Sequence, residues 1–300
     1  MPGTKGQHYI TESYQLNFSN TKGKIWVLDE NDKIFSTNPT NTFKEAHFYT
    51  ITFPSFPEPL LVERTLAEVE GNFATVVKEK LEKGISLAND DRVSVSLFAS
   101  AMFIRTKQQR ENLKNFFTNA LGHMRAIKSD PKLVEFYKSI PSSPPDEDET
   151  SFSEIELEKG LKDFDSYHSL TTLDNMYDIA PTIFEMKWIF LVAPKNKVFI
   201  SSDNPLNMVS PGREQKYGLN RFGSMAGLAH ADVELTLPLS SKITLFASWK
   251  NEKEFYISAT DKQVDQLNYR IIRGTKNLFA NNKNILEFIL KVEKDSKTKK

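Results

Sequence analysis

Apolar positions recur at three- and four-residue spacing in several segments, which is the pattern of amphipathic helices. The clearest segment spans residues 60–83, where Leu66, Val69 and Phe73 share one face. Gly84 follows directly, and a glycine just beyond a periodic segment is a common helix stop. We therefore predict a long helix that ends at this glycine. A short helical turn is also expected near Thr11, because threonine is a favourable N-terminal cap.

A second strong helical pattern starts at Asp90 or Asp91, either of which can cap it. It is apolar on most sides up to Ile104, so we expect this helix to be central in the core. The pattern continues on a narrower stripe, and we predict one helix that runs through Arg105 and Arg110 as far as Leu121. Further helical segments are predicted at 131–139, 161–186 with an interruption at Pro181, and 263–279, with a short final element at 285–292.

Short runs of β-branched and aromatic residues between turn residues predict strands. One hairpin is expected from residues 24–29 and 33–37, and another from 188–193 and 198–201, where Lys195-Asn196 makes the turn. Residues 38–59 are predicted as a long loop with a possible short element at 43–49, and residues 209–230 as a long loop and possible lid. The remaining strands are expected at 233–237, 243–249 and 254–258. Because most strands are grouped apart from the helices, we predict an α+β fold with a mostly antiparallel sheet packed against a helical bundle.

One segment has a composition unlike the rest of the chain. Residues 141–152 are rich in proline and acidic side chains, which predicts a mobile surface loop. Sheet-forming segments lie on both sides of it, so we expect residues 1–293 to form a single domain. Residues 294–300 are predicted to be a disordered basic tail.

Composition excludes several kinds of function. The chain has 300 residues, with 39 basic and 39 acidic side chains, so it has no overall charge that would attract nucleic acid or anionic lipid. The absence of cysteine excludes disulfides, thiolate metal sites and a cysteine nucleophile. The start of the chain has no apolar signal segment, and the longest apolar run, Leu97–Ile104, is too short to cross a bilayer. We expect a cytoplasmic protein with no membrane partner.

Histidine is the side chain best suited to proton transfer near neutral pH, and His8 has an unusual neighbourhood. It lies among hydroxyl and amide side chains, including Gln7 and Tyr9, which could contact a substrate. The alternative is that His8 only fixes an N-terminal arm to the sheet. His47, His123, His168 and His230 are isolated and lack metal-ligand spacing, so we expect no metal and no cofactor.

The sequence Ser201-Ser202-Asp203-Asn204-Pro205 ends a predicted strand with several polar groups. Asp203 could orient His8, while Ser202 and Asn204 could donate hydrogen bonds to an anionic group. An Asx turn that satisfies the loop backbone explains the same residues without a function. No Gly-x-Ser-x-Gly elbow is present, so a serine hydrolase is not supported.

Arg105 follows the most apolar helix, and a buried guanidinium needs an anionic partner. Glu63 and Glu70 are seven residues apart on one helix face, so they are suitable partners in a structural Arg–Glu network. In the alternative, Arg105 binds a phosphate of a nucleotide.

Several short motifs follow one another along the chain: Gln7-His8-Tyr9-Ile10, Tyr14-Leu16-Asn17-Phe18, Glu63, Glu70, Arg105-Thr106, Ser202-Asp203-Asn204-Pro205 and Pro238-Leu239-Ser240. In this order they resemble a family of uncharacterised, mainly bacterial proteins that is catalogued as domain of unknown function 4238. The resemblance covers the chain from about Gln7 to the last helix. This chain departs from the family pattern in having Thr11 and Lys107 where the family usually has proline. The resemblance implies no established activity.

The leading hypothesis is an enzyme that acts on a phosphate-containing substrate, either a metal-independent nuclease or a nucleotide-modifying, toxin-like protein. His8 would be the general acid or base, Asp203 its orienting acid and Arg105 the anion contact. A role in bacterial defence against phage would suit such a protein. The alternative is a non-enzymatic protein-interaction module whose polar motifs are structural. The sequence leaves open whether the substrate is a small molecule or nucleic acid, and which oligomer forms.

Overall fold

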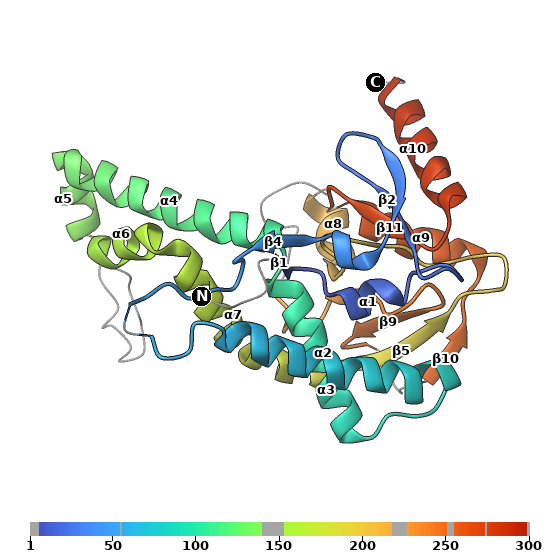
Figure 1. The fold of residues 1–300 in the computed structure, drawn as a ribbon. Coiled ribbons are helices and arrows are strands. Elements are labelled where there is room, and N and C mark those ends of the chain that lie inside the picture. The colour runs from blue at the N-terminus through green and yellow to red at the C-terminus, as the bar shows by residue number, and fades with distance from the viewer. Residues whose placement is uncertain are drawn as a thin grey trace.

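The computed structural model describes residues 6–54, 56–139, 153–217, 227–250, 255–273 and 275–298. The predicted acidic and proline-rich loop at 141–152 lies outside these ranges, as do residues 218–226 of the predicted lid at 209–230. Within them, helices and mostly antiparallel sheets form the α+β fold expected from the sequence (Figure 1).

The largest sheet of the described chain has the strand order β10-β5-β9-β8-β7. Its neighbouring strands are antiparallel except for β10 and β5, which are parallel. This sheet confirms the strands predicted at 188–193, 233–237, 243–249 and 254–258. Its strands are β5 (Lys187–Val192), β7 (Asn207–Val209), β8 (Glu234–Pro238), β9 (Ile243–Ser248) and β10 (Phe255–Ser258).

A second, fully antiparallel sheet joins distant parts of the chain in the order β3-β2-β11-β6. The hairpin of β2 (Ile25–Leu28) and β3 (Ile34–Thr37) is confirmed. The hairpin predicted from 188–193 and 198–201 is wrong. Both edges of β5 are occupied, by β9 and β10, so the returning chain crosses to the other sheet as β6 (Ser201–Ser202).

The partner of β6 is β11 (Leu278–Ala280), which the sequence had assigned to the end of a helix. The helix α9 (Asp261–Ile272) ends six residues earlier, and all three residues of β11 are buried. A short apolar run does not distinguish a buried strand from a helix segment by periodicity, which explains the error.

Three long helices pack together beside the sheets. They are α2 (Leu61–Glu79), α3 (Asn89–Ile104) and α7 (Phe164–Glu185), and α3 packs against both of the others. A 3-10 turn at Leu81–Lys83 ends at Gly84, whose φ of 64° is the left-handed conformation that glycine favours. Pro181 lies inside α7 and does not interrupt it, contrary to the prediction.

The helix predicted to run from Asp90 or Asp91 to Leu121 is two helices in the structure. It begins at Asn89 and stops at Ile104, and α4 (Lys107–Ser129) starts after Arg105 and Thr106. Thr106 has an extended backbone, and its hydroxyl accepts a hydrogen bond of 3.3 Å from the Gln109 N–H. The break turns the chain at Arg105 and lets that side chain leave the helix axis.

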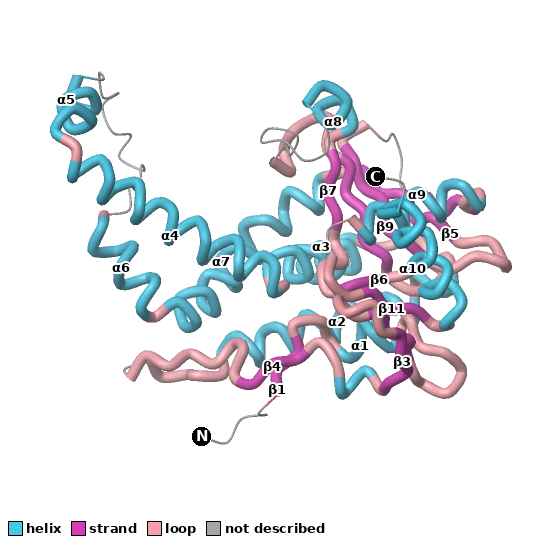
Figure 2. Tube along the Cα trace, turned by 90° about the horizontal axis from the view of Figure 1, so that it is seen from above, coloured by secondary structure: helices cyan, strands magenta, loops and turns pink. Residues whose placement is uncertain are grey.

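The helices α4, α5 (Pro131–Ser139) and α6 (Glu154–Lys162) lie together on the side of the molecule away from the sheets (Figures 1 and 2). At the other side, α8 (Pro211–Tyr217) follows β7, so part of the predicted 209–230 loop is helical. The final helix α10 (Lys283–Thr298) includes residues 294–298, which had been predicted as disordered tail.

The N-terminal segment crosses the face of this assembly. β1 (Gly6–His8) pairs with β4 (Lys44–Ala46) antiparallel, with His8 opposite Lys44. The predicted helical turn is α1 (Glu12–Leu16), which directly follows Thr11, and a 3-10 turn at Pro39–Asn41 precedes β4. Among the described residues, no helix combines the length and the apolar character needed to cross a membrane.

Candidate functional site

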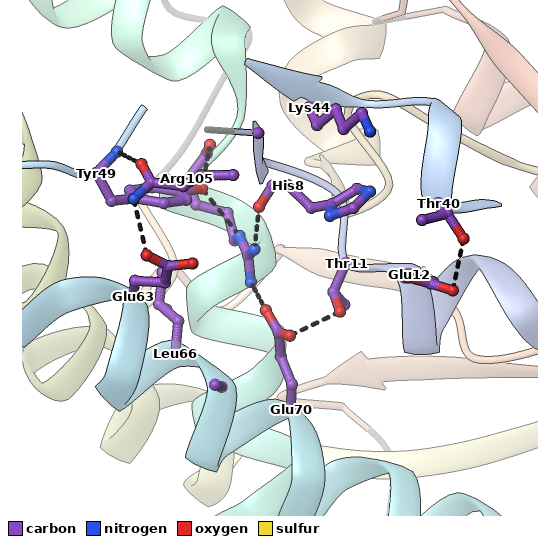
Figure 3. A pocket seen from close by; sticks show the side chains of 13 residues that line it. His8, Thr11, Glu12, Thr40, Lys44, Tyr49, Glu63, Leu66, Glu70 and Arg105 are labelled. Carbon is purple, nitrogen blue, oxygen red and sulfur yellow. Dashed lines mark hydrogen bonds and ion pairs between the residues drawn. The ribbon is translucent and has the colours of Figure 1, made fainter. Parts of the chain in front are cut away.

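The β1–β4 pair, α1 and α2 surround a cavity of about 510 Å³ (Figure 3). We call it the His8 cavity. It brings together residues from four segments of the N-terminal third with Arg105 at the end of α3. Its walls are formed by Gly6, Gln7, His8, Thr11, Glu12, Thr40, Lys44, Tyr49, Glu63, Leu66, Ala67, Glu70 and Arg105.

Gln7 is buried and held at both ends of its amide. Its Oε1 accepts a hydrogen bond of 2.6 Å from the Tyr49 backbone N–H, and its Nε2 donates to Glu63 Oε2 at 2.9 Å. The side chain therefore ties β1 to the segment before α2 and to α2 itself. This geometry makes Gln7 a structural residue of the cavity wall, with Glu63 as its partner.

Arg105 is only 2% exposed, and each of its nitrogens has a partner within the protein. Nη1 forms an ion pair with Glu70 Oε1 at 2.5 Å, Nη2 donates to the His8 carbonyl at 2.5 Å, and Nε donates to the Tyr49 hydroxyl at 3.1 Å. Glu70 also accepts a 2.7 Å hydrogen bond from the Thr11 hydroxyl. The Arg–Glu network considered from the sequence is therefore present with Glu70, and its guanidinium is committed to the fold.

His8 presents an unsatisfied nitrogen to this environment. Its Nε2 is buried and has no hydrogen-bond partner among the described residues. Burial lowers the pKa of His8 below its ordinary value of 6.5, and the nearby Lys44 ammonium lowers it further, while Glu12 and the Pro39 carbonyl act in the opposite direction. His8 is therefore a neutral imidazole at pH 7, the form that can accept a proton.

Lys44 is an exposed cation in the cavity wall and lies beside His8 in Figure 3. Its ammonium forms no hydrogen bond or ion pair within the described chain, whereas Glu12 accepts a 2.9 Å hydrogen bond from the Thr40 hydroxyl. A Cβ on Gly6 would lie 3.1 Å from Lys44 Cδ, so the glycine allows the lysine to lie across β1. The histidine and the lysine together offer a proton acceptor and an anion contact.

Asp203 does not orient His8 as predicted. Its carboxylate accepts hydrogen bonds from the Thr275 hydroxyl, the Lys276 N–H at 3.2 Å and the Asn277 amide at 2.7 Å. These bonds fix the loop that leads into β11, and Asp203 lines a different cavity from that of His8. The turn interpretation of this motif describes the geometry: Asp203 closes the loop, and no described contact connects it to the histidine.

Tyr9, Ser202 and Asn204, which were also predicted to contact a substrate with His8, lie outside the His8 cavity as well. Ser202 is buried in β6, and its hydroxyl accepts a 3.1 Å hydrogen bond from the Asn204 N–H, so both act locally in the turn. Tyr9 points into the cavity that Asp203 also lines. Only Gln7, His8, Glu63, Glu70 and Arg105 of the predicted set line the His8 cavity.

The comparison with protein families agrees with the ordered motifs of the sequence. The model of a family described as protein of unknown function (DUF4238) matches residues 6–284, which is nearly the whole chain. The chain belongs to the DUF4238 family. No curated protein matches it, and neither does any solved structure. Family membership therefore leaves the activity of this DUF4238 chain to be argued from its own site.

Sequence reasoning missed several residues of the site in this DUF4238 chain. Thr40, Lys44 and Tyr49 lie in the segment predicted as a long loop with a possible short element at 43–49, and nothing in that pattern predicted that they approach His8. Lys44 reaches the site through the β1–β4 register, which pairs residues 36 positions apart. The sequence signal for this strand pairing was weak, because three-residue strands do not show a clear alternation of apolar and polar positions.

Proposed function

We propose that this protein is an enzyme that acts on a small phosphate-containing molecule bound in the His8 cavity. The observation that supports the proposal is the buried, unpartnered Nε2 of His8 in the wall of a polar cavity. A buried polar atom without a partner is costly, and such atoms are retained where a ligand or a reacting group completes the hydrogen bond.

The roles follow from the charges around the cavity. His8 is the general base that accepts a proton from an attacking hydroxyl or water. Lys44 contacts the phosphate, because its ammonium has no ion-pair partner among the described residues. Arg105 is not the anion contact; it is the positioning residue that holds β1 through the His8 carbonyl.

A nucleotide is the substrate class that fits this division of charge best. Lys44 and His8 lie toward β4, where the Glu12 carboxylate is hydrogen-bonded to Thr40. The carboxylates of Glu63 and Glu70 belong to α2 on the other wall (Figure 3). Phosphate oxygens require donors, and sugar hydroxyls donate readily to carboxylates. Nucleotide modification or metal-independent cleavage of nucleic acid ends, in a bacterial defence role, is the finer activity within this proposal.

The test is a substrate screen with matched variants. The full-length protein is incubated with nucleoside mono-, di- and triphosphates and with short oligonucleotides, and products are followed by mass spectrometry. His8→Gln should lower kcat about 100-fold or more, because it removes the proton acceptor. Lys44→Met should mainly raise KM, because it removes a contact to the bound phosphate.

The control is His123→Gln, since His123 is an exposed histidine on α4 far from the cavity wall. Its activity and its melting temperature should equal those of the wild type. His8→Gln should melt no lower than the wild type, because the replaced nitrogen has no hydrogen bond to lose. Turnover in the screen that persists unchanged in His8→Gln would reject the mechanism.

The saturation of Arg105 and Asp203 by internal partners supports the second candidate, a non-enzymatic interaction module. If that candidate is correct, no phosphate compound is turned over or bound. Protein partners captured by the wild type would then also be captured by His8→Gln.

A further inference from the structure

A second polar cavity, of about 260 Å³, lies apart from the His8 cavity and shares no residue with it. We call it the Tyr9 cavity. It is formed where the residue after β1 meets α4 and the loop before β11. The residues that matter for its chemistry are Tyr9, Glu30, Lys107, Glu111, Asp203 and Lys276.

Tyr9 supplies an unpartnered polar group to this cavity. The residue is 6% exposed, and its ring packs against Phe43 and Phe48 at centroid distances of 6.1 and 5.7 Å. Within the described chain its hydroxyl forms no hydrogen bond, and this oxygen is accessible from the cavity. Burial and the nearby Asp203 raise the pKa of Tyr9, so the hydroxyl keeps its proton and can donate it.

The cavity wall presents charges of both signs. Lys107 and Lys276 provide ammonium groups, while Glu30 and Glu111 provide carboxylates. Lys107 forms an ion pair with Glu45, and Lys276 forms a longer one with Glu111 at 3.6 Å. The side chains of both pairs are more than 40% exposed. Exposed pairs contribute little to stability, so a ligand can replace them at low cost.

Two contacts in the cavity wall limit the kind of ligand that it can hold. The Lys107 ammonium lies 4.7 Å from the centre of the Tyr9 ring, which leaves that face of the ring closed to a stacked base or sugar. Asp203 already accepts three hydrogen bonds from the loop at 275–277, so it shapes the cavity and leaves ligand contact to the other carboxylates.

We infer that the Tyr9 cavity binds a small zwitterion, an amino acid. Its carboxylate accepts hydrogen bonds from the Tyr9 hydroxyl and the two lysines, and its ammonium pairs with Glu30 and Glu111. A simple anion would face the two glutamates, and a simple cation would face the two lysines. A molecule that carries both charges satisfies both walls. The inference is independent of the activity proposed for the His8 cavity.

The test is isothermal titration of the full-length protein with each of the twenty amino acids at millimolar concentration. Acetate and methylammonium serve as the separate halves of the ligand, and glucose serves as a neutral polyol. At least one amino acid should bind with one molecule per chain, while the halves and glucose should not. Tyr9→Phe should weaken the binding about tenfold or more, because it deletes one hydrogen bond to a charged group and keeps the ring.

Lys107→Met and Glu30→Gln should each weaken amino-acid binding. The first removes a cation that pairs with the ligand's carboxylate, and the second removes an anion that pairs with its ammonium. Tyr269→Phe is the matched control: Tyr269 is an exposed tyrosine on α9, outside this cavity, and its loss of a hydroxyl should leave affinity unchanged. His8→Gln should also bind normally, which separates this inference from the proposed function. Absence of amino-acid binding, or equal affinity in Tyr9→Phe, would overturn it.

Discussion

Arg105 joins three parts of the chain that are distant in sequence. It contacts Glu70 on α2, Tyr49 before α2, and the carbonyl of His8, which is 97 positions away. A buried guanidinium with all its nitrogens bonded is costly to disturb, because removal of one partner leaves an uncompensated charge. The position of β1, and hence of the His8 imidazole, therefore depends on an arginine whose three nitrogens each have a partner within the described chain.

The sequence allowed part of this arrangement to be predicted. Glu63 and Glu70 on one helix face are evident partners for an arginine that follows an apolar helix, and Glu70 is one. Tyr49 and the His8 carbonyl are not predictable in this way, because their contacts depend on how a three-residue strand pairs across the cavity. Asp203 shows the same limit, since its three partners all lie more than 70 positions away.

A second buried histidine, His168, leads to a prediction about the pH dependence of stability. His168 is 3% exposed between the rings of Phe48 and Phe164, and its Nδ1 forms no hydrogen bond with the part of the chain that the structure describes. Burial, with help from Arg110, lowers the pKa of His168 from 6.5 to about 4. Below pH 6.5 the unfolded chain therefore takes up a proton that the folded protein excludes. The resulting stability is complete above pH 6.5 and is lost as the pH falls toward 4.

We expect the free energy of unfolding to fall by about 3 kcal/mol from this histidine between pH 6.5 and pH 4. Urea unfolding across this range measures it. His168→Phe keeps a ring between the two phenylalanines and should flatten the dependence, while His123→Gln should leave it as in the wild type. An equally steep dependence in His168→Phe would show that other groups cause the loss.

At the scale of elements, the break between α3 and α4 determines where the site forms. The apolar periodicity continues through it, which is why the sequence predicted one helix. The local signal was present in Thr106 and Gln109, since a threonine followed three residues later by glutamine is the start pattern of a capped helix. A continuous helix would carry Arg105 along its axis, away from its bonds to β1 and Tyr49.

Thr106→Ala should therefore destabilise the protein by about 1 kcal/mol, the usual cost of losing an N-terminal cap. Thr106→Ser restores the hydroxyl and should recover most of this loss. Both values come from urea unfolding of the two variants beside the wild type. Equal stability of the alanine and serine variants would mean that the cap contributes nothing, and that packing alone ends α3.

At the scale of the whole molecule, the β3-β2-β11-β6 sheet connects the two ends of the fold. Phe279 of β11 is fully buried and meets the rings of Tyr14, Phe18 and Phe43 at centroid distances of 6.2, 5.4 and 5.1 Å. Composition and pattern gave the correct fold class, because the α+β class depends only on which elements exist. The partners of β6 and β11 depend on contacts across most of the chain, which no local pattern encodes.

Phe279→Ala should destabilise the protein by about 3–5 kcal/mol, since it leaves a cavity among three aromatic rings from the N-terminal part. Phe288→Ala is the matched control, because Phe288 is 67% exposed on α10 and its change should stay within about 0.5 kcal/mol. Chemical denaturation of both variants measures the two losses in unfolding free energy. Similar losses in the two variants would show that Phe279 does not hold the N-terminal rings.

The same sheet has a consequence for synthesis on the ribosome. β2 and β3 are complete by residue 37, but their neighbour β11 ends only at residue 280. About 240 residues separate the two, and their synthesis takes about 10 to 50 seconds at typical translation rates. During this interval the edge of β2 that later pairs with β11 is open, and an open strand edge can pair with other chains. The nascent protein should therefore depend on chaperones until its last strand emerges.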